Sequence, residues 1–135
     1  MERMYASAPI NEFYQPVLTV MEGEAILEFD VQDKFHHAAG AMHGSVYFKA
    51  MDDAAYFAVN SLVKDVFVLT SSFNIYLTRP VVKGRVKTVG KVVNASSRIF
   101  VAEAIMYDEQ GREVGRGSGS FMKGPTRLSP EIGYV

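Results

Sequence analysis

The pattern of apolar and polar positions marks out one stretch of the chain, residues 36–60. Its second half is apolar at almost every position, from Val46 to Val59. A surface helix carries one apolar stripe, so a helix that is apolar on every side is expected to be buried on every side. The pattern predicts a core helix from about Val46 to about Leu62, with Ser45 as its N-cap residue.

Strand patterns surround this helix. Alternation of apolar and polar residues predicts strands at residues 17–21 and 25–31 before it, and at 66–78, 84–95, 98–107 and 112–122 after it. Arg79-Pro80 ends the first of the later strands because proline cannot donate to a sheet ladder. We expect these four later strands to form a meander.

Three glycines recur at every second position of the last predicted strand: Gly115, Gly117 and Gly119. Glycine weakens a strand, so three on one face predict that another backbone approaches closely. The long helix is the natural candidate. The expected fold is α+β, with one long buried helix wrapped by an antiparallel sheet of five or six strands.

Length and composition fit a single domain over residues 1–135, with a core at about 17–123 and a loosely held tail. Residues 1–16 should form a short helix or loop packed on the surface. A net charge of −1 gives no field that favours nucleic acid, and no apolar run is long enough for a membrane span. With no cysteine and no apolar leader-like segment, a cytoplasmic location is expected.

The candidate chemistry lies in the same stretch of the chain. Asp52 and Asp53 fall inside the apolar helix, and buried acids that are not paired often mark functional sites. The three histidines, His36, His37 and His43, match no metal-ligand spacing, and we expect neither a metal nor a cofactor.

The sequence His43-Gly44-Ser45, with Asp52 nine residues after His43, resembles the hotdog-fold acyl-CoA thioesterases, most closely the phenylacetate-pathway (PaaI-like) type. The signature of that family is His-Gly-Gly followed by a helix that carries an aspartate at this spacing. In this chain, Ser45 replaces the second glycine. The resemblance extends from about Gly23 to about Met122.

The resemblance implies a hotdog fold and hydrolysis of acyl-CoA or aryl-CoA thioesters. It implies that Asp52 is the catalytic general base or nucleophile and that the Gly44 N–H donates to the oxyanion. Thr70 lies where family members often have a serine or threonine that orients water. His37 lies where many members have an asparagine or glutamine that contacts the thioester, so this residue departs from the family pattern.

The spacing within the helix adds a constraint. Eight residues separate Gly44 from Asp52, which is about 12 Å along a helix. One reacting carbonyl group cannot lie within about 3 Å of both groups of the same chain. We therefore expect a site shared across a two-fold dimer interface, and the resemblance implies the same, as a dimer or a dimer of dimers.

Six basic residues and no acid lie between Val66 and Ala102. Arg79 and Lys83, near the proline bend, are the best candidates for contacts with coenzyme A phosphates. The others fit a solvated sheet face paired with Glu103 or Glu113. His43 and Ser45, which flank Gly44, complete the substrate-binding candidates, although a bracing hydrogen bond to the loop would also explain His43.

Two other functions stay open from the sequence. A non-catalytic acyl-CoA binding module would keep the pocket without activating water. A hotdog dehydratase or hydratase would use histidine and acid patterns that this chain does not show. The acyl group, the carrier (coenzyme A or acyl carrier protein) and the choice between dimer and tetramer are not specified by the sequence.

Overall fold

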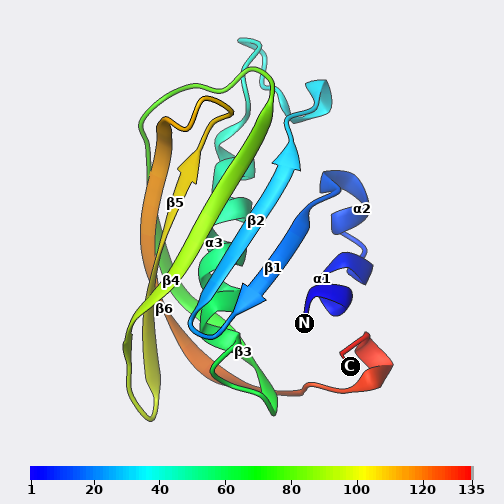
Figure 1. Cartoon of the computed structure of the whole chain (residues 1–135), viewed down its shortest axis with the longest axis vertical. Coiled ribbons are helices and arrows are strands. Elements are labelled where there is room, and N and C mark those ends of the chain that lie inside the picture. The colour runs from blue at the N-terminus through cyan, green and yellow to red at the C-terminus, as the bar shows by residue number, and fades with distance from the viewer. Residues whose placement is uncertain (135) are drawn as a thin grey trace.

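The computed structural model describes residues 1–134 and contains one long helix and six strands (Figure 1). The elements are α1 (Glu2–Ser7), α2 (Asn11–Tyr14), β1 (Val17–Met21), β2 (Glu24–Asp30), η1 (Asp33–Phe35), α3 (Gly44–Asn60), β3 (Val66–Leu77), β4 (Arg85–Ala95), β5 (Ile99–Tyr107), β6 (Glu113–Arg127) and η2 (Pro130–Ile132). None of the helices in this part of the chain combines the length and the apolar character needed to cross a membrane.

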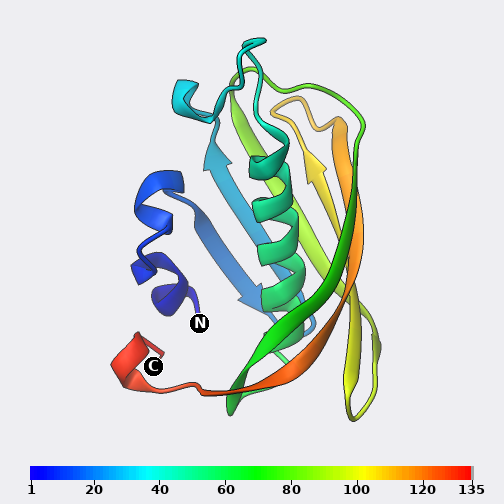
Figure 2. The same ribbon diagram turned by 180° about the vertical axis from the view of Figure 1, so that it is seen from behind.

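The strands form one antiparallel sheet in the order β1-β2-β4-β5-β6-β3. The sheet curls so that β1 and β2 lie on one side of α3 and β3 lies on the other (Figure 2). The helix fills the hollow, with Ala50, Met51, Ala54 and Ala58 fully buried. The predicted α+β fold, with one helix wrapped by an antiparallel sheet, is confirmed.

The predicted four-stranded meander is wrong at its first strand. β3 pairs with β6, not with β4, in a register that places Phe73 opposite Gly119 and Leu77 opposite Gly115. Residues 78–84 carry the chain from one edge of the sheet to its middle, so only β4, β5 and β6 form a meander. This order lets buried Val68 of β3 close the core on the far side of α3.

The helix begins two residues earlier than the sequence predicts. Gly44 is its first residue and His43 its N-cap, since the Nδ1 atom of His43 accepts a hydrogen bond from the Ser45 backbone N–H at 3.0 Å. The prediction that Ser45 is the N-cap is therefore wrong. The helix ends at Asn60, two residues before the predicted end, and β6 continues past Met122 to Arg127.

The glycine that lies against the backbone of α3 is in β4. A Cβ atom at Gly90 would collide with the backbone of Ala54, so β4 is where helix and sheet approach most closely. At Gly117 and Gly119, a Cβ atom would instead meet the Phe73 ring and backbone carbonyls of β3. The prediction that the helix backbone lies against the three glycines is thus wrong: Gly117 and Gly119 make room for a neighbouring aromatic ring, and Gly115 faces the side chains of Met51 and Tyr47 of α3.

Residues 1–16 contribute to the core beside α3. Tyr5 in α1 is only 5% exposed, and its ring packs edge-on against Phe57 with 5.1 Å between centroids. The Asn11 side-chain amide donates to the Tyr5 carbonyl oxygen at 2.7 Å. The C-terminal segment returns to the same place, where Gly133 lies against Met4, so both termini lie close together (Figure 2).

Candidate active site

A cavity of about 370 Å³ opens at the N-terminus of α3. Gly44 lines it as the first residue of the helix, where backbone N–H groups have no helical partner and the helix dipole is positive. The other lining residues come from the preceding loop, from the first turns of the helix and from the end of β3: His37, Ala41, Met42, Tyr47, Leu77, Thr78, Arg79 and Pro80. Such a cavity can hold a group that develops negative charge.

The loop before α3 is fixed by hydrogen bonds to segments on both sides. The His43 N–H donates to the Phe35 carbonyl at 2.9 Å, and the Met42 N–H donates to the Val81 carbonyl at 2.8 Å. The Tyr47 hydroxyl donates to the Arg79 carbonyl at 2.8 Å. These bonds join the helix start to the bend after β3, so the Gly44 N–H has a defined direction.

Asp52 lies two turns further along α3, on the flank that faces β3. Its Oδ1 atom accepts a hydrogen bond from the Thr70 hydroxyl at 2.9 Å. The pairing of β3 with β6 shifts register between Thr70 and Ser72, next to this contact. Sequence reasoning placed both residues in the site, and the structure brings them into contact.

The environment of Asp52 favours its neutral form. Removal from water raises the pKa of the Asp52 carboxyl above its ordinary value, and the negative charge of Asp53 raises it further. The Thr70 hydrogen bond and the positive charge of Lys49 lower this pKa and offset part of the increase. A half-buried carboxylate of raised pKa is a stronger base than one in water.

Asp53, the second acid within α3, forms hydrogen bonds and an ion pair with other residues. Its Oδ2 atom accepts from the Tyr5 hydroxyl at 2.6 Å and forms an ion pair with Lys49 at 2.6 Å. The Lys49 ammonium also lies over the Tyr5 and Tyr14 rings, 5.3 and 5.0 Å from their centroids. Asp53 therefore attaches the N-terminal helices to α3, and sequence reasoning did not find its partners.

The predicted site residues fall into two groups. The cavity at the helix start is lined by Gly44, His37 and Arg79. Asp52 lies about 12 Å further along α3, with Thr70 of β3 bonded to it, and neither residue lines the cavity. Ser45 and His43 bond to each other, with 2.8 Å between the Ser45 Oγ and His43 Nδ1 atoms. Lys83, in the bend before β4, does not line this cavity.

Two aromatic residues lie beside Asp52, and from the sequence both were expected in core or interface packing or in the lining of an acyl or aryl pocket. Phe48, one turn before Asp52, stacks edge-on with Phe73 of β3 at 5.8 Å between centroids. Tyr56, one turn after it, donates its hydroxyl to the Val68 carbonyl at 2.6 Å, and burial and the Asp52 charge raise its pKa. The sequence signal for this arrangement was the position of Phe48 four residues before Asp52 and of Tyr56 four residues after it, since this spacing places all three side chains on one flank of a helix.

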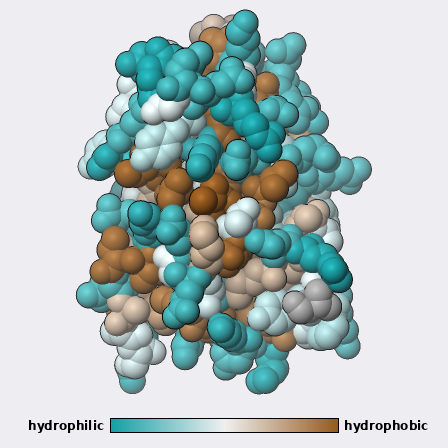
Figure 3. All heavy atoms as spheres, in the orientation of Figure 1, coloured by the Kyte–Doolittle hydropathy of each residue, from teal (hydrophilic) through white to brown (hydrophobic). Residues whose placement is uncertain are grey.

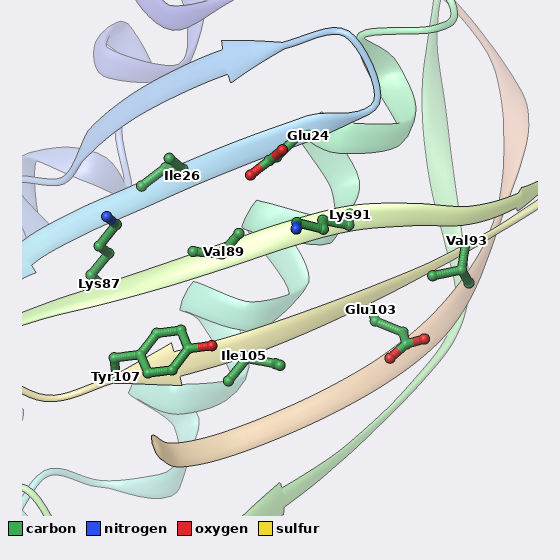
Figure 4. A pocket seen from close by; sticks show the side chains of 9 residues that line it. All are labelled: Glu24, Ile26, Lys87, Val89, Lys91, Val93, Glu103, Ile105 and Tyr107. Carbon is green, nitrogen blue, oxygen red and sulfur yellow. The ribbon is translucent and has the colours of Figure 1, made fainter. Parts of the chain in front are cut away.

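A separate groove of about 500 Å³ crosses the outer face of the sheet (Figure 4). Figure 3 shows apolar side chains gathered on this face among polar ones. Lys91 lies opposite Glu24 on β2 and Glu103 on β5 in the strand register, and Arg85 forms ion pairs with Glu28 and Asp30. These pairings support the interpretation of Lys91 and Arg85 as part of a paired, solvated sheet face, whereas Glu113 forms its ion pair with Arg116.

Within residues 1–134, no three His, Asp or Glu side chains are placed so that they could hold a metal ion.

This chain is similar in sequence to known proteins. A "Putative esterase" of Saccharolobus solfataricus is 26% identical over 101 residues, which cover 75% of this chain and 67% of that protein.

Two solved structures are similar over nearly the whole chain. The E. coli PaaI protein from the phenylacetic acid degradation operon has a TM-score of 0.84 and 19% identity, covering 93% of this chain and 91% of the other. A conserved protein of Pseudomonas aeruginosa has a TM-score of 0.83 and 25% identity, covering 92% and 100%. The family model described as "Thioesterase superfamily" matches residues 39–115, more than half of the chain, and the protein therefore belongs to the thioesterase superfamily.

Proposed function

We propose that this protein hydrolyses acyl-CoA or aryl-CoA thioesters, in the manner of the PaaI-like thioesterases, with Asp52 as general base or nucleophile. One observation carries the proposal. Asp52 is a half-buried carboxylate of raised pKa that accepts a hydrogen bond from the Thr70 hydroxyl. Membership of the thioesterase superfamily supports thioester hydrolysis in general.

The chemistry needs a base and a site for negative charge. As general base, Asp52 takes a proton from water while the water oxygen forms a bond to the thioester carbon. As nucleophile, its carboxylate attacks that carbon directly and water then hydrolyses the resulting anhydride. In both cases the carbonyl oxygen becomes negative, accepts a hydrogen bond from the Gly44 N–H, and returns to a carbonyl as the thiolate leaves.

The two groups are too far apart in one chain to act on one carbonyl, so we infer a site shared by two chains. β3 is an edge strand of twelve residues whose backbone groups on one side have no neighbour in the sheet. Long unprotected edges pair with other strands. Two β3 edges related by a two-fold axis would bring Asp52 of one chain towards the partner's Gly44.

The substrate contacts follow from the cavity. Arg79 lines it and is the first candidate for a coenzyme A phosphate, and Lys83 lies four residues further along the same bend. The substrate is a small thioester; neither a nucleic acid nor a membrane partner is proposed, and neither is a cofactor. A cytoplasmic location stays a prediction from the sequence.

The proposal is tested by thiol release from short, long and aromatic acyl-CoAs. We expect the wild-type protein to release thiol from at least one class, and the ranking within the panel to identify the acyl group. Acyl groups on acyl carrier protein complete the panel. If no substrate releases thiol, the proposal is wrong, and binding of intact acyl-CoA or hydration of an enoyl-CoA would then identify the binding module or the hydratase.

Substitution of Gly44 by proline tests the oxyanion donor. Proline removes the N–H but suits the first position of a helix, and the extended backbone of His43 (φ −64°, ψ 145°) suits the residue before a proline. We expect Gly44→Pro to lower kcat by about 100-fold or more, the cost typical of one lost oxyanion donor. Steady-state thiol release measures the effect.

Gly44→Ala is the matched control for this substitution. Its Cβ atom would lie 3.2 Å from the Leu77 Cδ1 atom, the end of a flexible side chain, as the Cβ of proline also would. Alanine keeps the N–H, so its activity should stay within a few-fold of wild type. Equal losses in the two variants would show that the added carbon atom, and not the N–H, is responsible.

Thr70 offers a test of the base through pH. Its hydroxyl lowers the pKa of Asp52, so Thr70→Val should raise that pKa. The base acts only when deprotonated, and activity falls as pH drops through its pKa. The acidic limb of the kcat/KM profile should therefore move to higher pH in Thr70→Val and stay near wild type in Thr70→Ser. An unmoved limb in the valine variant would contradict Asp52 as the titrating base.

A further inference from the structure

The ammonium group of Lys49 is held between α3 and the two N-terminal helices. Its Nζ atom lies 2.6 Å from the Asp53 Oδ2 atom and 3.5 Å from the Tyr5 hydroxyl oxygen. The same atom lies over the rings of Tyr5 in α1 and Tyr14 in α2. Only 14% of the Lys49 side chain is exposed, so these contacts fix a charge that the flexible stem of a surface lysine would leave mobile.

This charge lies beside the proposed catalytic carboxylate. Lys49 precedes Asp52 by three residues, and side chains with this spacing on a helix are neighbours, with about 5–6 Å between their Cβ atoms. Asp53, the residue after Asp52, brings a negative charge to the same part of the helix. A like charge disfavours the ionised form of a carboxyl group, and an opposite charge favours it. Lys49 therefore offsets the effect of Asp53 on Asp52.

The other groups around Asp52 do not supply such a charge. Burial, the largest influence, raises the pKa of the Asp52 carboxyl, as does the charge of Asp53, whereas the Thr70 hydrogen bond and the Lys49 charge lower it. Thr70, which reaches Asp52 from β3, is neutral, and the Tyr56 hydroxyl donates to a backbone carbonyl of β3. Among the groups of residues 1–134 that act on Asp52 in this way, Lys49 is thus the positive one.

We propose that Lys49 is a positioning residue for the reaction: the N-terminal helices hold its ammonium group beside Asp53, and its charge keeps Asp52 in the ionised form that acts as base or nucleophile. The inference rests on the proposed function and adds to it a residue that does not line the cavity. In this role Lys49 acts through Asp52 and makes no contact with the thioester. It also gives α1 and α2 a part in the reaction, since Tyr5 and Tyr14 belong to them.

The pH profile of kcat/KM separates this role from a purely structural one. Lys49→Met removes the positive charge and leaves that of Asp53 unopposed. Asp52 should then take up a proton more readily, and the acidic limb should move to higher pH. Asp53→Asn removes the negative charge, so its limb should move to lower pH. Lys49→Arg keeps the positive charge, and its limb should stay near that of wild type.

The double variant, Lys49→Met with Asp53→Asn, is the matched control. Both charges are absent from it, so its acidic limb should lie between those of the two single variants. A merely structural ion pair predicts another pattern, in which each variant lowers kcat by a similar factor at every pH and the limb stays in place. That pattern would overturn the proposal, and so would a limb that moves as far in Lys49→Arg as in Lys49→Met.

The charge on Asp52 can also be followed without any substrate. In protein with ¹³C-labelled aspartate carboxyl groups, the chemical shift of each carboxyl carbon reports its protonation as the pH changes, and the signal lost in Asp52→Asn belongs to Asp52. We expect the midpoint of its titration to move to higher pH in Lys49→Met, and an unmoved midpoint would overturn the proposal. A wild-type protein that releases no thiol would overturn the proposed function and the role of Lys49 in it, but the titration would still show whether Lys49 keeps Asp52 ionised.

Discussion

Asp52→Asn is expected to lower kcat/KM by about 1,000-fold while leaving the protein folded. Asparagine keeps the size of the side chain and an oxygen that can accept the Thr70 hydrogen bond, but it can neither take a proton from water nor attack a thioester. Loss of general-base catalysis typically costs 10²- to 10⁴-fold. Thiol release from the best substrate of the panel measures the effect.

The neighbouring acid provides a matched control. Asp53→Asn is the same chemical change one residue further along α3, but Asp53 already bonds to Tyr5 and Lys49. We expect its activity to stay within about ten-fold of wild type. If Asp53→Asn were the inactive variant and Asp52→Asn the active one, the catalytic carboxylate would be Asp53 and the role proposed for Asp52 would be wrong.

Thermal unfolding gives a second readout of Asp52→Asn. Because burial raises the pKa of Asp52 in the folded state, the folded protein binds more protons than the unfolded chain just above the ordinary aspartate pKa. Stability therefore falls as pH rises through this window, and the cost of the buried charge is fully present above the raised pKa. Asp52→Asn should thus raise Tm at neutral pH and have little effect on Tm below pH about 3.

The helix and its chemistry could be predicted from the sequence because both depend on local signals. One short stretch contains an apolar run that covers all sides of a helix, the His43-Gly44 pair, and Asp52 nine residues after His43. The structure places Thr70 against Asp52, and places His37 and Arg79 in the cavity of Gly44. The family resemblance pointed to Thr70 and His37, and the basic charge near the proline bend pointed to Arg79.

The errors concern contacts between residues far apart in the chain. The sequence of β3 does not show whether the strand pairs with β4 or with β6, because both strand orders are compatible with the same alternation of apolar and polar residues. The closest approach of helix and sheet lies at Gly90, a single glycine in a strand, whereas Gly117 and Gly119 of the conspicuous glycine row accommodate Phe73. Likewise, the bond from Tyr5 to Asp53 spans 48 residues and leaves no local pattern.

The helix start was misplaced for a different reason. Serine is the commoner N-cap, and Ser45 stood directly before the apolar run. In the structure, His43 takes this position with its ring nitrogen, which leaves Gly44 as the first helical residue. The shift of the helix start is small, but it puts the Gly44 N–H at the end of the helix dipole, where a donor to an oxyanion is most effective.

Two inactive variants are expected to restore activity when they form one dimer. If the site is shared, a heterodimer of Asp52→Asn and Gly44→Pro chains contains one site in which both groups are intact and one in which both are altered. The heterodimer should therefore show about half of the wild-type activity, although each homodimer is nearly inactive. Co-expression with two different affinity tags and sequential purification isolates it for the thiol-release assay.

The reciprocal heterodimer distinguishes a shared site from one built within a single chain. When both substitutions are placed in one chain and the other chain is wild type, each shared site has one altered group, and the dimer should be nearly inactive. A site contained in one chain predicts the opposite, with half activity in this dimer and none in the first. We infer the shared arrangement from the distance of about 12 Å along α3 between Gly44 and Asp52, so a reversed result would remove one of the two residues from the reaction.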